Sequence, residues 1–154
     1  MKTKNVLFFL FLFSSLGFAQ TEISNSKFDK ALADSLQADV YGMKSYVFVV
    51  LKTGKIMIDD KDKVNELFRG HLDNIKRLAK ENKLVVAGPF GENENQYRGL
   101  FILNVKTIEE AQKLVETDPA INSGLLDVDF YEWYGSAALP MYLETVEKIT
   151  KENF

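Results

Sequence analysis

The stretch that decides the fold is Phe68–Phe90, FRGHLDNIKRLAKENKLVVAGPF. Apolar residues recur at helical spacing from Val64 to Ala79, which predicts an amphipathic helix that ends near Asn82. After a polar turn, the apolar run at 84–87 predicts a buried strand, which the Gly-Pro pair at 88–89 closes. The stretch therefore predicts a helix packed against a sheet.

The remaining elements complete an α+β pattern. Apolar runs at 45–51, 97–105 and 125–134 predict three more strands, the first of them central because it is apolar on both faces. Thr107, with Glu110 three residues on, predicts the cap of a second helix that ends before Pro119. The order β-α-β-β-α-β predicts a ferredoxin-like antiparallel sheet with two helices on one face.

This domain is expected to span residues 44–138, with short helices on either side. In the extension at 20–43, Ser26 is the expected cap of a short helix through Leu36. At 139–154, Pro140 is expected at the first position of a C-terminal helix.

Both faces of the sheet are expected to be apolar, because Val47 and Val49 alternate with Phe48 and Val50 along the first strand. Two helices can cover only one face of the sheet. A face-to-face homodimer would bury the other, and the alternative is that the terminal helices fold across it.

Residues 1–19 have the pattern of a secretory signal sequence. Two lysines precede an apolar run that is shorter than a membrane span, and small residues follow at Gly17 and Ala19. We expect cleavage after Ala19, an exported (periplasmic or secreted) protein and no membrane anchor once the signal is removed. Because the segment holds two lysines and no acidic residue, cleavage would lower the formal net charge from −3 to −5.

The composition excludes several classes of function. An acidic chain is a poor candidate for nucleic acid, whose binding needs clustered cations. The chain has no cysteine, which excludes disulfides, thiolate catalysis and sulfur-ligated metals. The chain has a single histidine, which argues against a transition-metal site. We expect neither a metal nor another cofactor.

The chain resembles the YCII-related (YciI-like) family over roughly residues 43–138. The resemblance is carried by His71 in the first helix, by ENKLVVAGPF, YRGLFILNV and EEAQKLVETDPAINSGLL, and by the aromatic strand DFYEWYGSAAL. It implies a dimeric α+β barrel built from ferredoxin-like halves. It also implies that His71 pairs with the aspartate of the DP motif, Asp118.

Such a pair suits acid/base chemistry, because a carboxylate on one imidazole nitrogen fixes the tautomer and raises the basicity of the other. The structural alternatives are a buried, hydrogen-bonded His71 and an Asp118 that only caps a turn. Asp127 and Asp129 are competing partners for the histidine. Trp133 is a candidate for an aromatic pocket wall beside the pair.

We therefore expect cofactor-independent acid/base catalysis on a small cyclic or aromatic compound, as in an isomerase, a lyase or a dehydrochlorinase. His71 and Asp118 are the expected catalytic residues, with Trp133 and Pro89 bordering the substrate. The alternative is a non-catalytic dimeric module that binds a small ligand or has a structural role.

Overall fold

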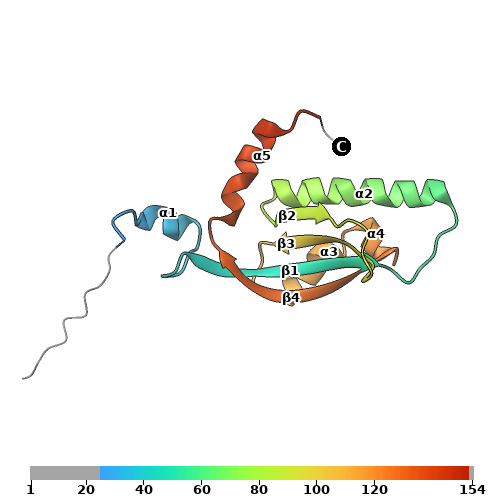
Figure 1. Ribbon diagram of the computed structural model, residues 1–154, viewed down its shortest axis with the longest axis horizontal. Coiled ribbons are helices and arrows are strands. Elements are labelled where there is room, and N and C mark those ends of the chain that lie inside the picture. The colour runs from blue at the N-terminus through green and yellow to red at the C-terminus, as the bar shows by residue number, and fades with distance from the viewer. Residues whose placement is uncertain (1–24, 153–154) are drawn as a thin grey trace, which may run out of the picture.

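The computed structural model describes residues 25–152, so the predicted signal sequence at 1–19 lies outside the described residues. Figure 1 shows the arrangement of the elements. In chain order these are α1 (Lys30–Ser35), β1 (Met43–Thr53), α2 (Lys61–Lys80), β2 (Leu84–Pro89), β3 (Tyr97–Leu103), α3 (Ile108–Val115), α4 (Pro119–Asn122), β4 (Leu126–Ser136), the 3-10 helix η1 (Leu139–Tyr142) and α5 (Leu143–Ile149).

The sheet has the strand order β2-β3-β1-β4, and every neighbouring pair is antiparallel. This is the predicted ferredoxin-like topology. The strand that is apolar on both faces, β1, lies between β3 and β4, where both of its edges are hydrogen-bonded. The crossover from β3 to β4 contains α3 and the additional short helix α4.

The hydrophobic core lies between the sheet and the helices on one face. Alternate residues of β1 and β3 face Leu78 of α2 and Ala111 of α3, so both crossover helices pack on the same side. The buried strand residues of this core are Val47, Val49, Leu51, Leu84, Phe101, Leu103 and Leu126.

Local signals position the ends of the helices. Asp60 caps α2 by accepting hydrogen bonds from the amides of residues 62 and 63. The helix ends where predicted, and Asn82, just after α2, takes a positive φ of 54°. Thr107 caps α3 as predicted. The predicted Ser26 cap is wrong, because the first helix begins later and Asp29 caps it.

The opposite face of the sheet carries an apolar surface, which we call the second face. Strand pairing places Phe48 opposite both Ile102 and Tyr131, and Tyr46 opposite Trp133. Tyr131 and Trp133 are 52% and 37% exposed, so part of this surface is in contact with solvent. Tyr46 is fully buried, and its burial raises its pKa to about 12 because desolvation disfavours the phenolate.

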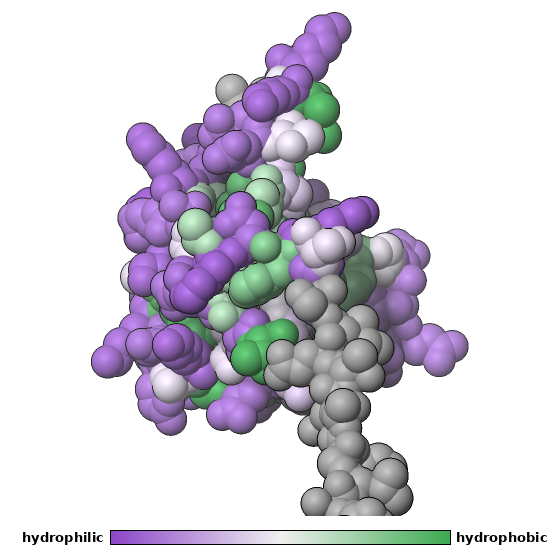
Figure 2. Space-filling view, turned by 90° about the vertical axis from the view of Figure 1, so that its left-hand side faces the viewer, coloured by the Kyte–Doolittle hydropathy of each residue, from purple (hydrophilic) through white to green (hydrophobic). Residues whose placement is uncertain are grey.

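The terminal helices do not contribute to the core. Neither α1 nor α5 has a buried residue, and Figure 1 shows α1 beyond one end of the sheet and α5 extending away from it. The Tyr142 hydroxyl of η1 donates a hydrogen bond to the carbonyl of Val85, which ties the start of the C-terminal segment to β2. The side of the molecule that lies on the left in Figure 1 is mostly hydrophilic, with apolar residues in small separate groups (Figure 2).

Within residues 25–152, no helix combines the length and the apolar character that crossing a membrane would require.

Candidate active site

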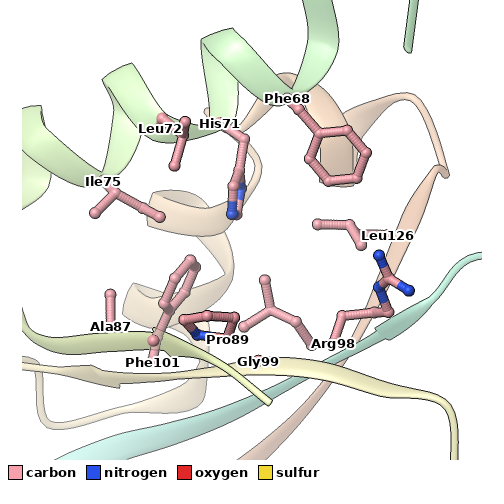
Figure 3. A pocket seen from close by; sticks show the side chains of 12 residues that line it. Phe68, His71, Leu72, Ile75, Ala87, Pro89, Arg98, Gly99, Phe101 and Leu126 are labelled. Atoms are coloured by element: carbon pink, nitrogen blue, oxygen red, sulfur yellow. The ribbon is translucent and has the colours of Figure 1, made fainter. Parts of the chain in front are cut away.

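A pocket lies between α2 and the ends of β2 and β3, with a volume of about 510 Å³. Its walls are almost entirely apolar, and the two ionisable side chains that line it are His71 and Arg98. Figure 3 shows them on opposite sides, His71 descending from α2 and Arg98 rising from the sheet. The other lining residues are Leu51, Phe68, Leu72, Ile75, Ala87, Gly88, Pro89, Gly99, Phe101 and Leu126.

The imidazole of His71 is held from several sides. Its ring stacks on Phe101, with centroids 5.9 Å apart and planes 23° apart. The ring of Phe68 is nearly perpendicular to it, with centroids 6.3 Å apart. Its Nδ1 lies 2.6 Å from Oδ2 of Asp118. Because Nδ1 is taken by Asp118 and the side chain lines the pocket, Nε2 is the ring nitrogen that remains for a molecule there.

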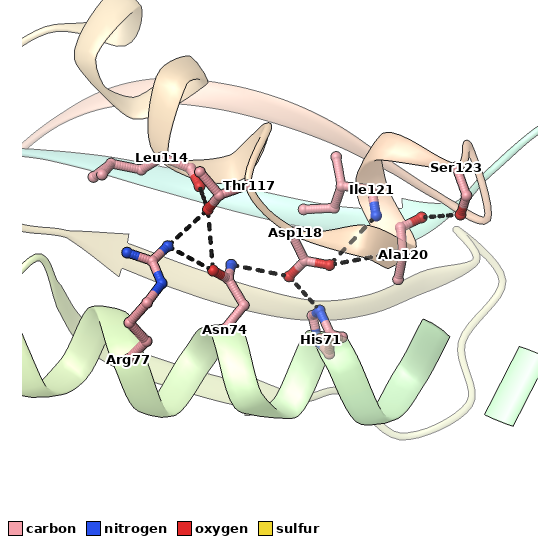
Figure 4. Close-up of polar contacts among 9 residues, drawn as sticks. All are labelled: His71, Asn74, Arg77, Leu114, Thr117, Asp118, Ala120, Ile121 and Ser123. Atoms are coloured by element: carbon pink, nitrogen blue, oxygen red, sulfur yellow. Dashed lines mark hydrogen bonds and ion pairs between the residues drawn. The ribbon is translucent and has the colours of Figure 1, made fainter. Parts of the chain in front are cut away.

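Asp118 serves as a helix cap and as the partner of His71 at the same time. The residue is fully buried, and its two carboxylate oxygens have different hydrogen-bond partners (Figure 4). Oδ1 accepts hydrogen bonds from the backbone amides of Ala120 and Ile121, which caps α4. Oδ2 faces His71 and has a longer contact of 3.5 Å to the amide of Asn74. The turn-capping and dyad interpretations of Asp118 are therefore compatible.

A polar network supports Asp118 from the side of α2. Asn74 lies one helical turn after His71, so both side chains project from the same face. Its Oδ1 accepts a hydrogen bond of 2.8 Å from Arg77, and this bond turns its amide group toward Asp118. Arg77 also donates to the hydroxyl of Thr117 at 2.9 Å. The network thus connects α2 to the segment that precedes α4.

The close approach of α2 and α4 depends on Gly70. A Cβ atom at this position would lie 2.8 Å from Cγ of Pro119, closer than a real Cβ contact allows. The proline ring is rigid and begins α4, so it has little freedom to move away. Gly70 and Pro119 flank the pair in sequence, and their contact brings His71 within hydrogen-bonding distance of Asp118.

Of the other residues proposed from the sequence, Pro89 lines the pocket and Trp133 does not. Trp133 lies on the second face, where its ring packs 5.6 Å from that of Tyr46. The predicted position of Trp133 beside the histidine is wrong, because strand alternation directs it to the side of the sheet away from α2.

The competing carboxylates have another partner. Lys52 lies 2.7 Å from Asp129 and 3.9 Å from Asp127. The hydrogen bond to Asp129 raises the pKa of the Lys52 amine above its ordinary value, since it stabilises the charged form. The tertiary structure therefore brings His71 to Asp118 and leaves the two β4 carboxylates to Lys52.

Two residues of the site, Asn74 and Arg98, were not predicted from the sequence. Asn74 carries a readable signal, because it is a polar residue three positions after His71 within an apolar helical stripe. Arg98 carries none, since its orientation depends on the pairing of β3. Residues 25–152 contain no group of three His, Cys, Asp or Glu side chains that could hold a metal ion.

Part of the chain is similar to known proteins. The uncharacterized protein YjpA of Bacillus subtilis (strain 168) is 26% identical over 91 residues, which are 59% of this chain and 95% of that protein. A solved structure, the 5-chloro-2-hydroxyhydroquinone dehydrochlorinase TftG of Burkholderia phenoliruptrix AC1100 with 2,5-dihydroxybenzoquinone, aligns at 19% identity and a TM-score of 0.41 over 56% of this chain and 92% of that one. The sequence profile of the YCII-related domain matches residues 45–134, more than half of the chain. The protein is therefore a member of the YCII-related family.

Proposed function

We propose that this protein is a cofactor-independent acid/base enzyme that acts on a small cyclic or aromatic compound. The observation that carries the proposal is the hydrogen bond of 2.6 Å between His71 and the buried Asp118, at the wall of a pocket with apolar sides. The bond is short because the acceptor is a carboxylate, and it holds the histidine in one tautomer.

The chemistry follows from that tautomer. With the proton on Nδ1 directed to Asp118, Nε2 carries a free electron pair toward the pocket. Nε2 takes a proton from a carbon next to a carbonyl group, and the electrons of the broken C–H bond move onto the carbonyl oxygen. In an isomerisation the imidazolium then returns its proton to another carbon. In an elimination the enolate electrons expel the leaving group as an anion, and the imidazolium gives its proton to that anion or to water, which regenerates the base.

The aromatic and apolar side chains around His71 favour this proton transfer. The imidazole is confined by Phe68 and Phe101, so its nitrogen is directed without further ordering. The pocket volume of about 510 Å³ suits a compound of drug-like size or smaller, and such a compound, packed against the apolar sides, would displace water from the base.

The test is a screen for proton exchange. Unsaturated lactones and substituted hydroquinones, chlorinated ones included, are incubated with the protein in D2O, and NMR follows deuterium incorporation and product formation. We expect at least one compound to exchange or react with the native protein and to be unchanged with His71→Gln. The thermal unfolding midpoint of the variant establishes that it remains folded.

A different result of the same screen would contradict the acid/base proposal. If compounds bind native protein and His71→Gln with equal affinity, and none of them exchanges or reacts, the acid/base proposal fails. The alternative of a non-catalytic module that binds a small ligand then stands in its place.

We also propose that the mature protein is an exported homodimer that begins at Gln20. Export is supported by the signal-like pattern of residues 1–19. Dimerisation is supported by the second face, where Tyr131 and Trp133 are partly exposed and neither terminal helix supplies a buried residue.

Native mass spectrometry of the exported protein tests both parts of this proposal. The expected mass is twice that of residues 20–154. A mass that includes residues 1–19 would contradict cleavage. A stable species of one chain at micromolar concentration would contradict the dimer.

A further inference from the structure

Arg98 is the second ionisable residue of the pocket, and its orientation comes from an irregularity in the sheet. Leu51 pairs with Gly99 and the next residue of β1, Lys52, pairs with Tyr97, so Arg98 is left as an extra residue in β3. Such a bulge bends the strand and redirects its side chains. In regular alternation Arg98 would face away from Gly99 and Phe101, yet all three line the same pocket (Figure 3).

The backbone around the bulge is held on both sides. The amide of Phe90 donates a hydrogen bond of 3.0 Å to the carbonyl of Arg98, and the amide of Thr53 donates to Gln96 at 3.1 Å. Gln96 takes a positive φ of 58°, an uncommon conformation for a residue other than glycine. These hydrogen bonds fix the backbone at the bulge, so the side chain of Arg98 projects from a defined position beside the pocket.

The guanidinium of Arg98 has no hydrogen bond or ion pair with any residue in 25–152. Its nearest acidic neighbours in sequence, Glu92 and Glu94, form no ion pair with it. The residue is exposed at the pocket, so its five donors are hydrated when the pocket holds only solvent. An anionic group placed among the apolar walls would have this cation as its partner.

We propose that Arg98 binds an anionic oxygen of the ligand, so that the pocket selects ring compounds that carry a carboxylate, a phenolate or an enolate. The planar fork of a guanidinium matches two oxygens of a carboxylate or one oxyanion, and the apolar residues around it take the ring. His71 then faces the opposite side of the bound ring. This inference rests on the proposed function for the role of His71, although the binding of the anion does not require turnover.

The experiment compares two probes of nearly the same shape, benzoate and the uncharged benzamide. Their dissociation constants are measured by NMR titration, from the amide signals of pocket residues, in native protein, Arg98→Gln, Arg98→Lys and Arg69→Gln. Arg69 is the matched control, because it is an exposed arginine of α2 that does not line the pocket. Thermal unfolding midpoints verify that each variant is folded.

We expect Arg98→Gln to weaken benzoate binding by about tenfold, because a hydrogen bond to a charged group is lost. Benzamide binding should change by less than about twofold, since its partners are the apolar walls. Arg98→Lys should fall between native and Arg98→Gln, because it keeps the charge and loses the fork. Arg69→Gln should leave both constants unchanged, and added salt should weaken benzoate binding alone.

Other results overturn the proposal. Absence of benzoate binding to the native pocket, equal binding by Arg98→Gln, or a similar effect of Arg69→Gln would each remove Arg98 as the anion partner. Selective loss of benzoate binding without any turnover in the screen would support the anion site and contradict the acid/base function, so the two failures are distinguishable.

Discussion

Replacing Asp118 with alanine is expected to lower the free energy of unfolding by about 2 to 4 kcal/mol. The carboxylate is fully buried and accepts from two backbone amides of α4 and from His71. Its removal takes away the helix cap, worth about 1 kcal/mol, and leaves buried donors without an acceptor. The substitution also removes the hydrogen bond by which His71 of α2 is joined to the start of α4.

The measurement is urea denaturation at one fixed protein concentration, because a dimer would make the midpoint depend on concentration. Asp73→Ala is the matched control, since Asp73 is exposed on the same helix as His71 and should change stability by less than about 0.5 kcal/mol. Asp118→Asn should fall between them, because its carbonyl oxygen still caps α4. An effect of Asp118→Ala as small as that of Asp73→Ala would show that the buried carboxylate does not hold the two helices together.

For any compound that the screen shows to react, His71→Gln is expected to lower kcat by about 10²- to 10⁴-fold, the usual range for loss of a general base. Asp118→Asn should cause a loss of comparable order, because Asp118 positions the tautomer of His71 through the bond of 2.6 Å. The double variant should lose no more than His71→Gln alone. Residues that act as one unit give losses that do not multiply.

Two further readouts separate positioning from a purely structural role. Because the chain has one histidine, its ¹⁵N signals report the tautomer without ambiguity. We expect the proton on Nδ1 in native protein and a mixture of tautomers in Asp118→Asn. Asp73→Asn should alter neither the kinetics nor the tautomer. Losses that multiply in the double variant would show that His71 and Asp118 act independently.

Much of the fold could be predicted because its determinants are local. The apolar periodicity of α2, its end near Asn82 and the cap at Thr107 depend on a few neighbouring residues. The antiparallel sheet follows from the order of the elements and the hand of crossover connections. Even the start of α1 was misplaced by only a few residues, since Ser26 and Asp29 are both good capping residues.

The candidate site was predicted in part, and its errors have a common origin. Strand alternation places Trp133 on the second face, although its neighbours in sequence suggested a pocket. A bulge that a single sequence does not reveal places Arg98 in the pocket. The partner of His71 depends on which carboxylate the chain between β3 and β4 places beside it. The sequence alone does not exclude Asp127 and Asp129, which in the structure contact Lys52.

The sequence by itself determined the elements, their order and the presence of one histidine on the apolar side of a helix, because these properties depend on neighbours within a few residues. Only the tertiary structure decided that one oxygen of Asp118 caps α4 while the other meets His71. It also decided that Gly70 lets α2 approach Pro119 and that Arg98 turns toward the same pocket. These contacts join segments distant in the chain, and their geometry is set by packing and strand register, which no local pattern of residues encodes.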